Sequence, residues 1–137
     1  IDLIKDLNVH SEVTIQKDYL SSSDIQSVLS QQDIIIYPYQ TSNESSSASV
    51  RDGLSSLKPV LVTPLQIFDD VHDLVDYLPG VSPNDLATGI LSWYKKYQTN
   101  TDSVNNLISS RAKLINSRRF SRLSMRLYSI INSLEKN

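Results

Sequence analysis

Apolar and polar positions follow two different periods along this chain. Residues 33–39 read DIIIYPY and residues 60–63 read VLVT, and both runs are apolar at consecutive positions and rich in β-branched residues. Such runs are typical of short strands that are buried on both faces of a parallel sheet. Around Val13 and Ile15, apolar and polar residues alternate instead, which predicts another short strand before the first run.

Elsewhere, apolar residues recur every three or four positions, which predicts helices. One helix has a clear start, because Ser82 can cap it, Pro83 fits its first position and Asp85 lies three residues after the cap. Residues 65–80 predict a short helix over IFDDVHDLV and then a short extended piece. The other predicted helices lie around Ile1–Leu7, Ile25–Leu29, Val50–Leu57, 102–117 and 120–135.

Strand and helix patterns therefore alternate, which indicates an α/β fold. We expect a Rossmann-like parallel sheet flanked by helices, with two further helices at the C-terminus. The 137 residues suffice for one domain with its own core, and no stretch reads as an interdomain linker, so a single domain over residues 1–137 is predicted. Because the sequence begins at Ile1 inside a helical pattern, we expect it to be a fragment of a longer protein.

Composition excludes several classes of function. The chain has no cysteine and only two histidines, which excludes a zinc–thiolate site and a thiol nucleophile and disfavours a multi-histidine metal site. The formal net charge is -2, whereas a dedicated DNA-binding domain is normally basic, so nucleic acid is not an expected partner. No apolar run reaches the ~20 residues that a membrane-spanning helix needs.

Charge is divided unevenly along the chain. Residues 1–110 carry six Lys/Arg and 14 Asp/Glu, whereas residues 111–137 carry seven Lys/Arg and a single Glu. The basic C-terminal helices could contact an anionic membrane surface or a lipid-phosphate acceptor, or they could form a solvated face that packs against another domain. The basic residues are Arg111, Lys113, Arg118, Arg119, Arg122, Arg126 and Lys136.

The sequence NESSSASVRDG, at residues 43–53, carries the richest candidate chemistry. Ligands of open parallel sheets bind beyond the carboxyl ends of the strands, where this segment would lie beside PLQIFDD at residues 64–70. The free N–H groups of residues 46–49 would face outward at the positive end of a helix dipole, which suits phosphate oxygens. Glu44 could bind sugar hydroxyls, and Asp52 a ribose further along the helix. The alternative, that the serines only form caps and turns, stays open.

These residues also resemble the donor-binding half of retaining GT-B glycosyltransferases, the group 1 family that contains sucrose synthases and many bacterial polysaccharide and lipopolysaccharide glycosyltransferases. The shared pattern reads DIIIYPY-(x)4-E-(x)7-DGLSSLKPVLVT in this chain, and the order of the parts agrees over nearly the whole chain. The chain departs from the family at Asp52, where the family has a second Glu. It departs again at Leu57-Lys58, where a small residue and Gly are usual, and at PLQIF, where a Gly-Gly loop is common.

The resemblance implies a role for each matched position. Glu44, the candidate catalytic residue, would contact hydroxyls of the transferred sugar, and Asp52 would contact the nucleotide ribose. The backbone amides of Ser46–Ala48 would meet the diphosphate, and Lys17–Tyr19 would line the nucleobase pocket. The full substrate-binding set that the match implies is Lys17, Asp18, Tyr19, Tyr39, Ser45, Ser46, Ser47, Ala48 and Asp52.

What the resemblance implies is sugar transfer from a nucleotide-diphosphate donor to a saccharide or lipid-linked acceptor, with retention at the anomeric carbon and with no metal or other cofactor. Such an enzyme is expected in the cytoplasm, with possible contact at the inner face of the membrane. The family's acceptor-binding domain and its basic pair would lie upstream of Ile1, so this chain by itself is expected to be inactive. Because the family's last helix packs back onto that domain, domain packing is favoured over membrane contact for the basic helices. A non-catalytic Rossmann-like interaction module that has lost nucleotide binding is the alternative.

Other polar and aromatic residues are assigned structural roles. Arg51 is interpreted as a solvated helix residue rather than a phosphate ligand, and His72 as a surface histidine among carboxylates. Asp69 and Asp70 are interpreted as part of a helix N-terminal turn, because adjacent side chains on one backbone diverge. The aromatic residues interpreted as core rather than as a sugar-stacking platform are Trp93, Tyr94 and Tyr97.

Overall fold

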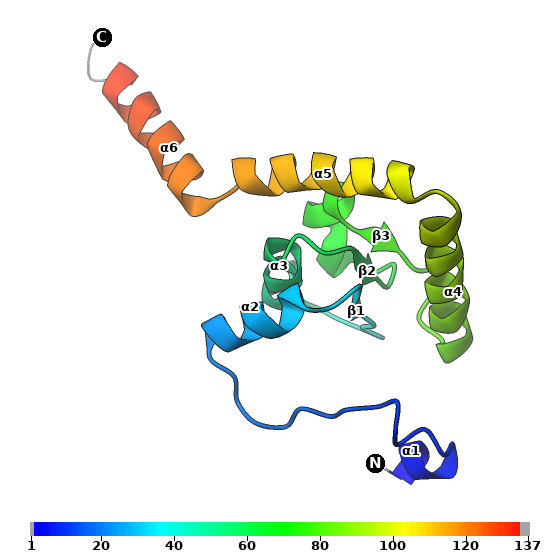
Figure 1. The fold of residues 1–137 in the computed structure, drawn as a ribbon. Helices are drawn as coiled ribbons and strands as arrows, with labels where there is room; N and C mark the ends of the chain where they lie inside the picture. Colours follow the sequence, from blue (N-terminus) through cyan, green and yellow to red (C-terminus); the bar gives the residue numbers. More distant parts are fainter. Residues whose placement is uncertain (1, 135–137) are drawn as a thin grey trace.

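A computed structural model describes residues 2–134 as a small parallel sheet surrounded by helices (Figure 1). The strands are β1 (Ile35–Tyr37), β2 (Val60–Val62) and β3 (Asp76–Tyr77). They lie in the order β1-β2-β3, and both neighbouring pairs are parallel, with Ile36 opposite Leu61 and Leu61 opposite Asp76. This arrangement confirms the predicted α/β class and the parallel sheet.

Seven helical segments complete the described chain. They are α1 (Asp2–Asp6), α2 (Ser22–Ser30), α3 (Ala48–Ser55), the 3-10 helix η1 (Gln66–Leu74), α4 (Pro83–Thr99), α5 (Thr101–Ser117) and α6 (Phe120–Leu134). The helix starts follow the sequence signals: the Ser82 hydroxyl accepts from the Asp85 amide at 3.2 Å, and the Asp85 carboxylate accepts from the Ser82 amide at 3.1 Å. The two predicted terminal helices are confirmed over α5 and α6, except for residue 135, which lies outside the described residues.

The hydrophobic core lies where α3 and η1 pack onto the sheet. All three residues of β2 are buried, as expected for a strand with a neighbour on each side and a covered face. Partly buried side chains of α5, among them Leu114 and Ile115, add to this core. The buried residues of the cluster are Ile35, Val50, Leu54, Val60, Val62, Ile67, Phe68, Val71, Leu74 and Val75.

The strand predicted around Val13 and Ile15 is wrong. Residues 13–20 form no strand, and both apolar side chains remain substantially exposed. Alternation indicates which side chains could share a face, but a strand also needs a neighbour to pair its backbone groups. β1 is an edge strand of the described sheet, and Figure 1 shows the preceding segment running apart from it before the chain enters α2.

At the end of α3, a leucine occupies a backbone conformation that favours glycine. Leu57 has a left-handed backbone conformation with φ 60°, and its amide donates to the Leu54 carbonyl at 3.1 Å. Glycine is the favoured residue at such a helix end because a side chain strains this conformation. Leu57 therefore has a branched side chain at a backbone position that suits glycine.

We therefore expect Leu57→Gly to be more stable than Leu57→Ala by about 1 kcal/mol, because both variants lose the leucine side chain but only alanine keeps the strain. Urea unfolding followed by circular dichroism measures the difference. The matched pair is Ser55→Gly and Ser55→Ala within α3, where the order should reverse, because glycine disfavours an ordinary helix by about 1 kcal/mol. The same order at both positions would contradict the left-handed geometry of Leu57.

Close packing of α3 on β1 explains Gly53, the residue after the second motif position. A Cβ atom at Gly53 would lie 2.7 Å from the Tyr37 hydroxyl oxygen and 2.9 Å from its Cε2 atom. Gly53→Ala is expected to lower the free energy of unfolding by about 1–3 kcal/mol, because the half-buried ring must move. Thermal unfolding measures this loss, with Ser55→Ala on the exposed side of the same helix as the control. A Gly53→Ala variant as stable as the parent would show that α3 does not rest on Tyr37.

Candidate functional site

An open cavity lies between the segments that follow β1 and β2, at the carboxyl end of the sheet. It has a volume of about 370 Å³ and is lined by Ser42, Asn43, Glu44, Ser45 and Gln66. Glu44 and Ser45 belong to the predicted site, and Gln66 is the first residue of η1. We call this the Glu44 cavity. Its position agrees with the rule that ligands of parallel sheets bind beyond the carboxyl ends of the strands.

Gln66 was not predicted as a site residue. The sequence did place the PLQIFDD segment at the same edge of the sheet, and this was the signal that could have found it. Its amide offers both a donor and an acceptor, whereas the Glu44 carboxylate is an acceptor when ionised. Together these two side chains have the hydrogen-bonding groups that a sugar or another polyol requires.

The loop before α3 is held by its own serines. The Ser42 hydroxyl accepts from the Glu44 amide at 3.2 Å, and the buried Ser47 hydroxyl caps α3 by accepting from the Val50 amide at 3.3 Å. The expectation that these serines form caps and turns is therefore correct for these two. This leaves the first-turn amides of Ala48 and Ser49 without acceptors inside the helix.

A network of hydroxyl groups, made by Tyr37, Tyr39, Ser47 and Ser49, joins β1 to the start of α3. The Tyr39 hydroxyl lies 2.7 Å from the Ser49 hydroxyl, which lies 3.0 Å from that of Ser47. The Tyr37 hydroxyl donates to the Ser49 carbonyl at 2.6 Å. Tyr39 and Ser47 are among the residues predicted to bind substrate, and in the structure their hydroxyls contact that of Ser49 in the first turn of α3.

Burial keeps Tyr37, one of the two tyrosines of this network, protonated. It raises the pKa of the Tyr37 phenol, a hydrogen bond with the Gly53 backbone opposes the rise, and the charges of Asp52 and Tyr39 add to it. Burial likewise raises the pKa of Tyr77, helped by Asp69 and Asp70. Tyr37 therefore remains a hydrogen-bond donor to the first turn of α3 through neutral and mildly alkaline pH.

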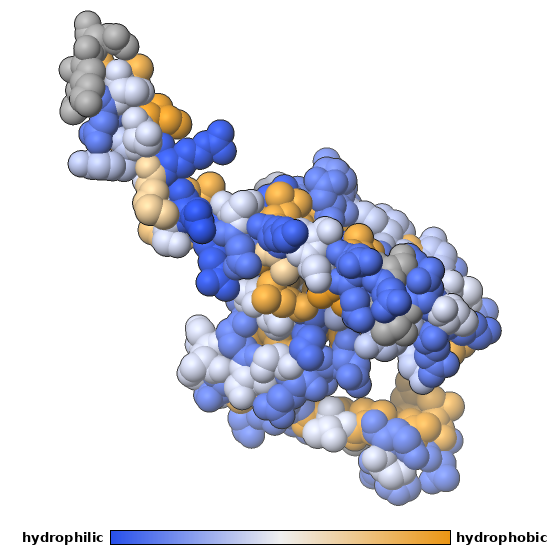
Figure 2. All heavy atoms as spheres, turned by 45° about the horizontal axis from the view of Figure 1, so that its top comes forward, coloured by the Kyte–Doolittle hydropathy of each residue, from blue (hydrophilic) through white to orange (hydrophobic). Residues whose placement is uncertain are grey.

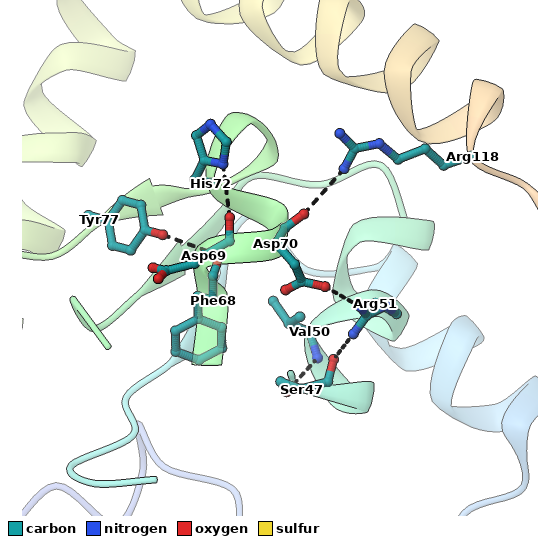
Figure 3. Close-up of polar contacts among 9 residues, drawn as sticks. All are labelled: Ser47, Val50, Arg51, Phe68, Asp69, Asp70, His72, Tyr77 and Arg118. Atoms are coloured by element: carbon teal, nitrogen blue, oxygen red, sulfur yellow. Dashed lines mark hydrogen bonds and ion pairs between the residues drawn. The ribbon is translucent and has the colours of Figure 1, made fainter. Parts of the chain in front are cut away.

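Arg51 is neither a free phosphate ligand nor a merely solvated residue. Its Nη1 atom donates to the Ser47 carbonyl at 2.6 Å, and its Nη2 atom forms an ion pair with the Asp70 carboxylate. Figure 3 shows Arg51 turned toward Asp70, whose backbone carbonyl also accepts from Arg118 Nη1 at 3.5 Å. Arg51 thus joins α3 to η1, and its charge is already balanced by a carboxylate.

The other predicted site residues lie outside the Glu44 cavity. Lys17, Asp18 and Tyr19 are exposed on the extended segment before α2, and Tyr19 is 97% exposed. Ser46 and Ala48 are exposed beside the cavity, at the amino end of α3. Asp52 does not line the Glu44 cavity. It is exposed on α3, and its carbonyl accepts from the side-chain amide of Gln26 of α2 at 3.2 Å.

The aromatic residues of α4 are more exposed than predicted. Tyr94 and Tyr97 are exposed, so their interpretation as core residues is wrong, while Trp93 is half-buried and stacks on Tyr97 with ring centroids 5.5 Å apart. The cause is that α4 lies beside the sheet, and its apolar stripe is wider than the surface that it covers. These rings line a hollow of about 540 Å³ that also includes Asp33 and Lys58.

His72 is exposed, as predicted, and lies between two carboxylate-bearing residues. Its Nδ1 atom is 2.9 Å from the Asp69 carbonyl oxygen, and its Nε2 atom is 3.0 Å from the Asp73 carboxylate. Within residues 2–134, no three His, Asp or Glu side chains gather in a way that could hold a metal ion. No helix in the same part of the chain is long and apolar enough to cross a membrane.

No protein-family model matches this chain, and no curated protein gives a significant match.

Proposed function

We propose that this chain is the donor-binding domain of a retaining glycosyltransferase with a Rossmann-like, GT-B type fold. The domain binds a nucleotide-diphosphate sugar, whose sugar is transferred to a saccharide or lipid-linked acceptor. The observation that carries the proposal is the Glu44 cavity, because it has an exposed carboxylate in the loop that leads into α3, at the carboxyl end of a parallel sheet.

Each part of the donor has a chemically suitable counterpart in this arrangement. The diphosphate lies against the amides of Ala48 and Ser49, where the helix dipole favours negative charge. The sugar hydroxyls bind Glu44 and Gln66, which supply acceptors and donors. As the bond to the sugar breaks, negative charge grows on the leaving diphosphate, and the helix-end amides stabilise it electrostatically. Further positive charge for this step would come from outside the described residues.

Calorimetric titration of the chain with UDP and with GDP tests the proposal. We expect saturable binding of one nucleotide with a dissociation constant in the micromolar range. Ser47→Pro removes one backbone N–H at the cap and the hydroxyl that holds the first turn, so it should weaken binding. Ser21→Pro, at the N-cap of α2, is the matched backbone change away from the site. Absence of heat with both nucleotides would reject the proposal for this chain.

A second candidate function is a non-catalytic Rossmann-like interaction module. It is favoured by one specific observation, namely that Arg51 is already paired with Asp70 and that Lys17–Tyr19 form no wall of the Glu44 cavity. This candidate requires no affinity for nucleotides, even in a longer protein that contains the chain. A micromolar dissociation constant for UDP or GDP would therefore eliminate it.

A further inference from the structure

Helix α6 stands away from the rest of the molecule. Figure 1 shows it continuing outward beyond α5, and residues 116–131 are all exposed. At the base of α6, Leu123 lines a groove of about 400 Å³ together with Arg118 and with Leu74 and Ile115 at the edge of the core. Most of α6 therefore offers its side chains to something other than this domain.

One face of α6 is apolar over its whole length. The residues recur at spacings of three and four, which places them on one stripe of a helix. Leu127, in the middle of the stripe, is 58% exposed. Figure 2 shows apolar side chains gathered along this helix beside strongly hydrophilic ones. The stripe, here called the α6 stripe, consists of Phe120, Leu123, Leu127, Ile130, Ile131 and Leu134.

Arginines flank the α6 stripe, and no acid balances them within the helix. Arg122 and Arg126 lie one turn apart on one side of the stripe, and Ile130 of the stripe continues the same row, so Arg126 is next to the apolar face. Arg118 and Arg119 precede the helix, and residues 103–134 contain no Asp or Glu. The surface that covers this helix must therefore accept both apolar side chains and a concentrated positive charge.

We infer that α6 is a membrane-surface helix that lies in the interface of an anionic lipid bilayer. An apolar face with bulky side chains and an arginine-bearing border is the pattern of helices that bury one side at the level of the acyl chains while the cations reach lipid phosphates. A second α6 is a poorer partner, because pairing the stripes would bring the arginines of two copies together, and the single acid that follows the helix in sequence, Glu135, is outnumbered by them. This inference does not use the proposed nucleotide-sugar binding, and it departs from the packing of the last helix onto another domain that the group 1 resemblance implies.

Co-sedimentation of the chain with phosphatidylcholine vesicles, with and without phosphatidylglycerol, tests the inference. We expect binding only to the anionic vesicles, and release as salt is raised above about 0.1 M, where charges are screened beyond about 10 Å. Replacing Arg122 and Arg126 by glutamine should reduce partitioning about 25-fold, since each basic residue near such a surface contributes about fivefold. Leu127→Asp should reduce it by about tenfold or more, because it places a charge in the apolar face.

Leu91→Asp on α4 is the matched control, because Leu91 is 57% exposed and undergoes the same change of side chain. It should bind vesicles as the parent does, and circular dichroism should show both variants folded. Equal binding to neutral and anionic vesicles, or unchanged binding of Leu127→Asp, would overturn the inference. So would a dimer in sedimentation velocity that depends on Leu127, found together with no vesicle binding, because the occupant of the stripe would then be a second copy.

Discussion

Asp76→Ala is expected to lower the free energy of unfolding by about 3–5 kcal/mol, because it leaves a largely buried arginine without its counter-charge. Arg111 is the partner: its Nη1 and Nη2 atoms donate to the two carboxylate oxygens at 2.7 and 3.2 Å. The Trp93 indole donates to the same carboxylate at 3.3 Å. Asp76 therefore joins β3 to both α4 and α5, and its loss disturbs all three elements.

Loss of this pair should cost more stability than loss of the other described ion pairs, because Arg111 and Asp76 are largely buried. Its side chain is 14% exposed and that of Asp76 is 25% exposed. The Nε atom of Arg111 is buried without a hydrogen-bond partner, so the guanidinium already bears a desolvation cost. The remaining bond, from Nη2 to the Val75 carbonyl at 2.8 Å, carries no compensating charge.

Urea unfolding of Asp76→Ala and Asp73→Ala measures the effect against a matched control. Asp73 pairs with His72 on the surface, and exposed pairs contribute at most about 1 kcal/mol. The double variant Asp76→Leu/Arg111→Met should recover much of the loss, because replacing both partners of a buried pair removes the stranded charge. Equal stability of Asp76→Ala and Asp73→Ala would mean that the Arg111 pair does not hold the helices.

Glu44→Ala is expected to weaken binding of a nucleotide-diphosphate sugar about 10- to 100-fold while leaving the corresponding nucleoside diphosphate unaffected. The reason is that Glu44 is proposed to meet only the sugar, and a hydrogen bond to a charged group contributes about 1.5–3 kcal/mol. Glu44 is an exposed loop residue, so its removal should not disturb the fold.

Competition binding against a fluorescent nucleotide separates the contribution of the sugar from that of the nucleoside diphosphate. The competitors are UDP, GDP and their hexose conjugates. Glu12→Ala is the control, because Glu12 is likewise an exposed glutamate but lies in the segment before α2. If Glu44→Ala weakened the nucleoside diphosphate and the sugar conjugate to the same extent, Glu44 would act on the fold or the diphosphate rather than on the sugar.

The parts of the fold that were predicted correctly depend on local sequence. The run before Pro38 specifies a strand by its own composition, although only Ile35 of it is fully buried, and the Ser82–Asp85 capping box is complete within four residues. The failure at Val13 and Ile15 has the opposite cause, since strand formation depends on a neighbour that may be distant in sequence. For the same reason, nothing local showed that α4 would leave Tyr94 exposed.

In the candidate site, too, features within one segment were predicted and contacts between distant residues were not. One continuous segment predicts the serine caps, the start of α3 and the position of Glu44. In the structure these three features lie in one loop and the helix that follows it. The pairing of Arg51 with Asp70 joins residues 19 positions apart, and that of Asp76 with Arg111 spans 35 positions. Such contacts depend on how η1 and α5 pack, so residue spacing alone gave no sign of them.

The most direct test of the proposed donor site is a titration of the isotope-labelled chain with UDP- and GDP-linked hexoses, followed by amide chemical shifts. We expect saturable changes at the backbone amides of Ala48 and Ser49 and at the side-chain amide of Gln66, with the Glu44 amide affected by the sugar conjugates but little by the nucleoside diphosphates. Changes concentrated around Trp93 on α4, or no changes with either donor, would contradict the assignment of the Glu44 cavity as the donor site.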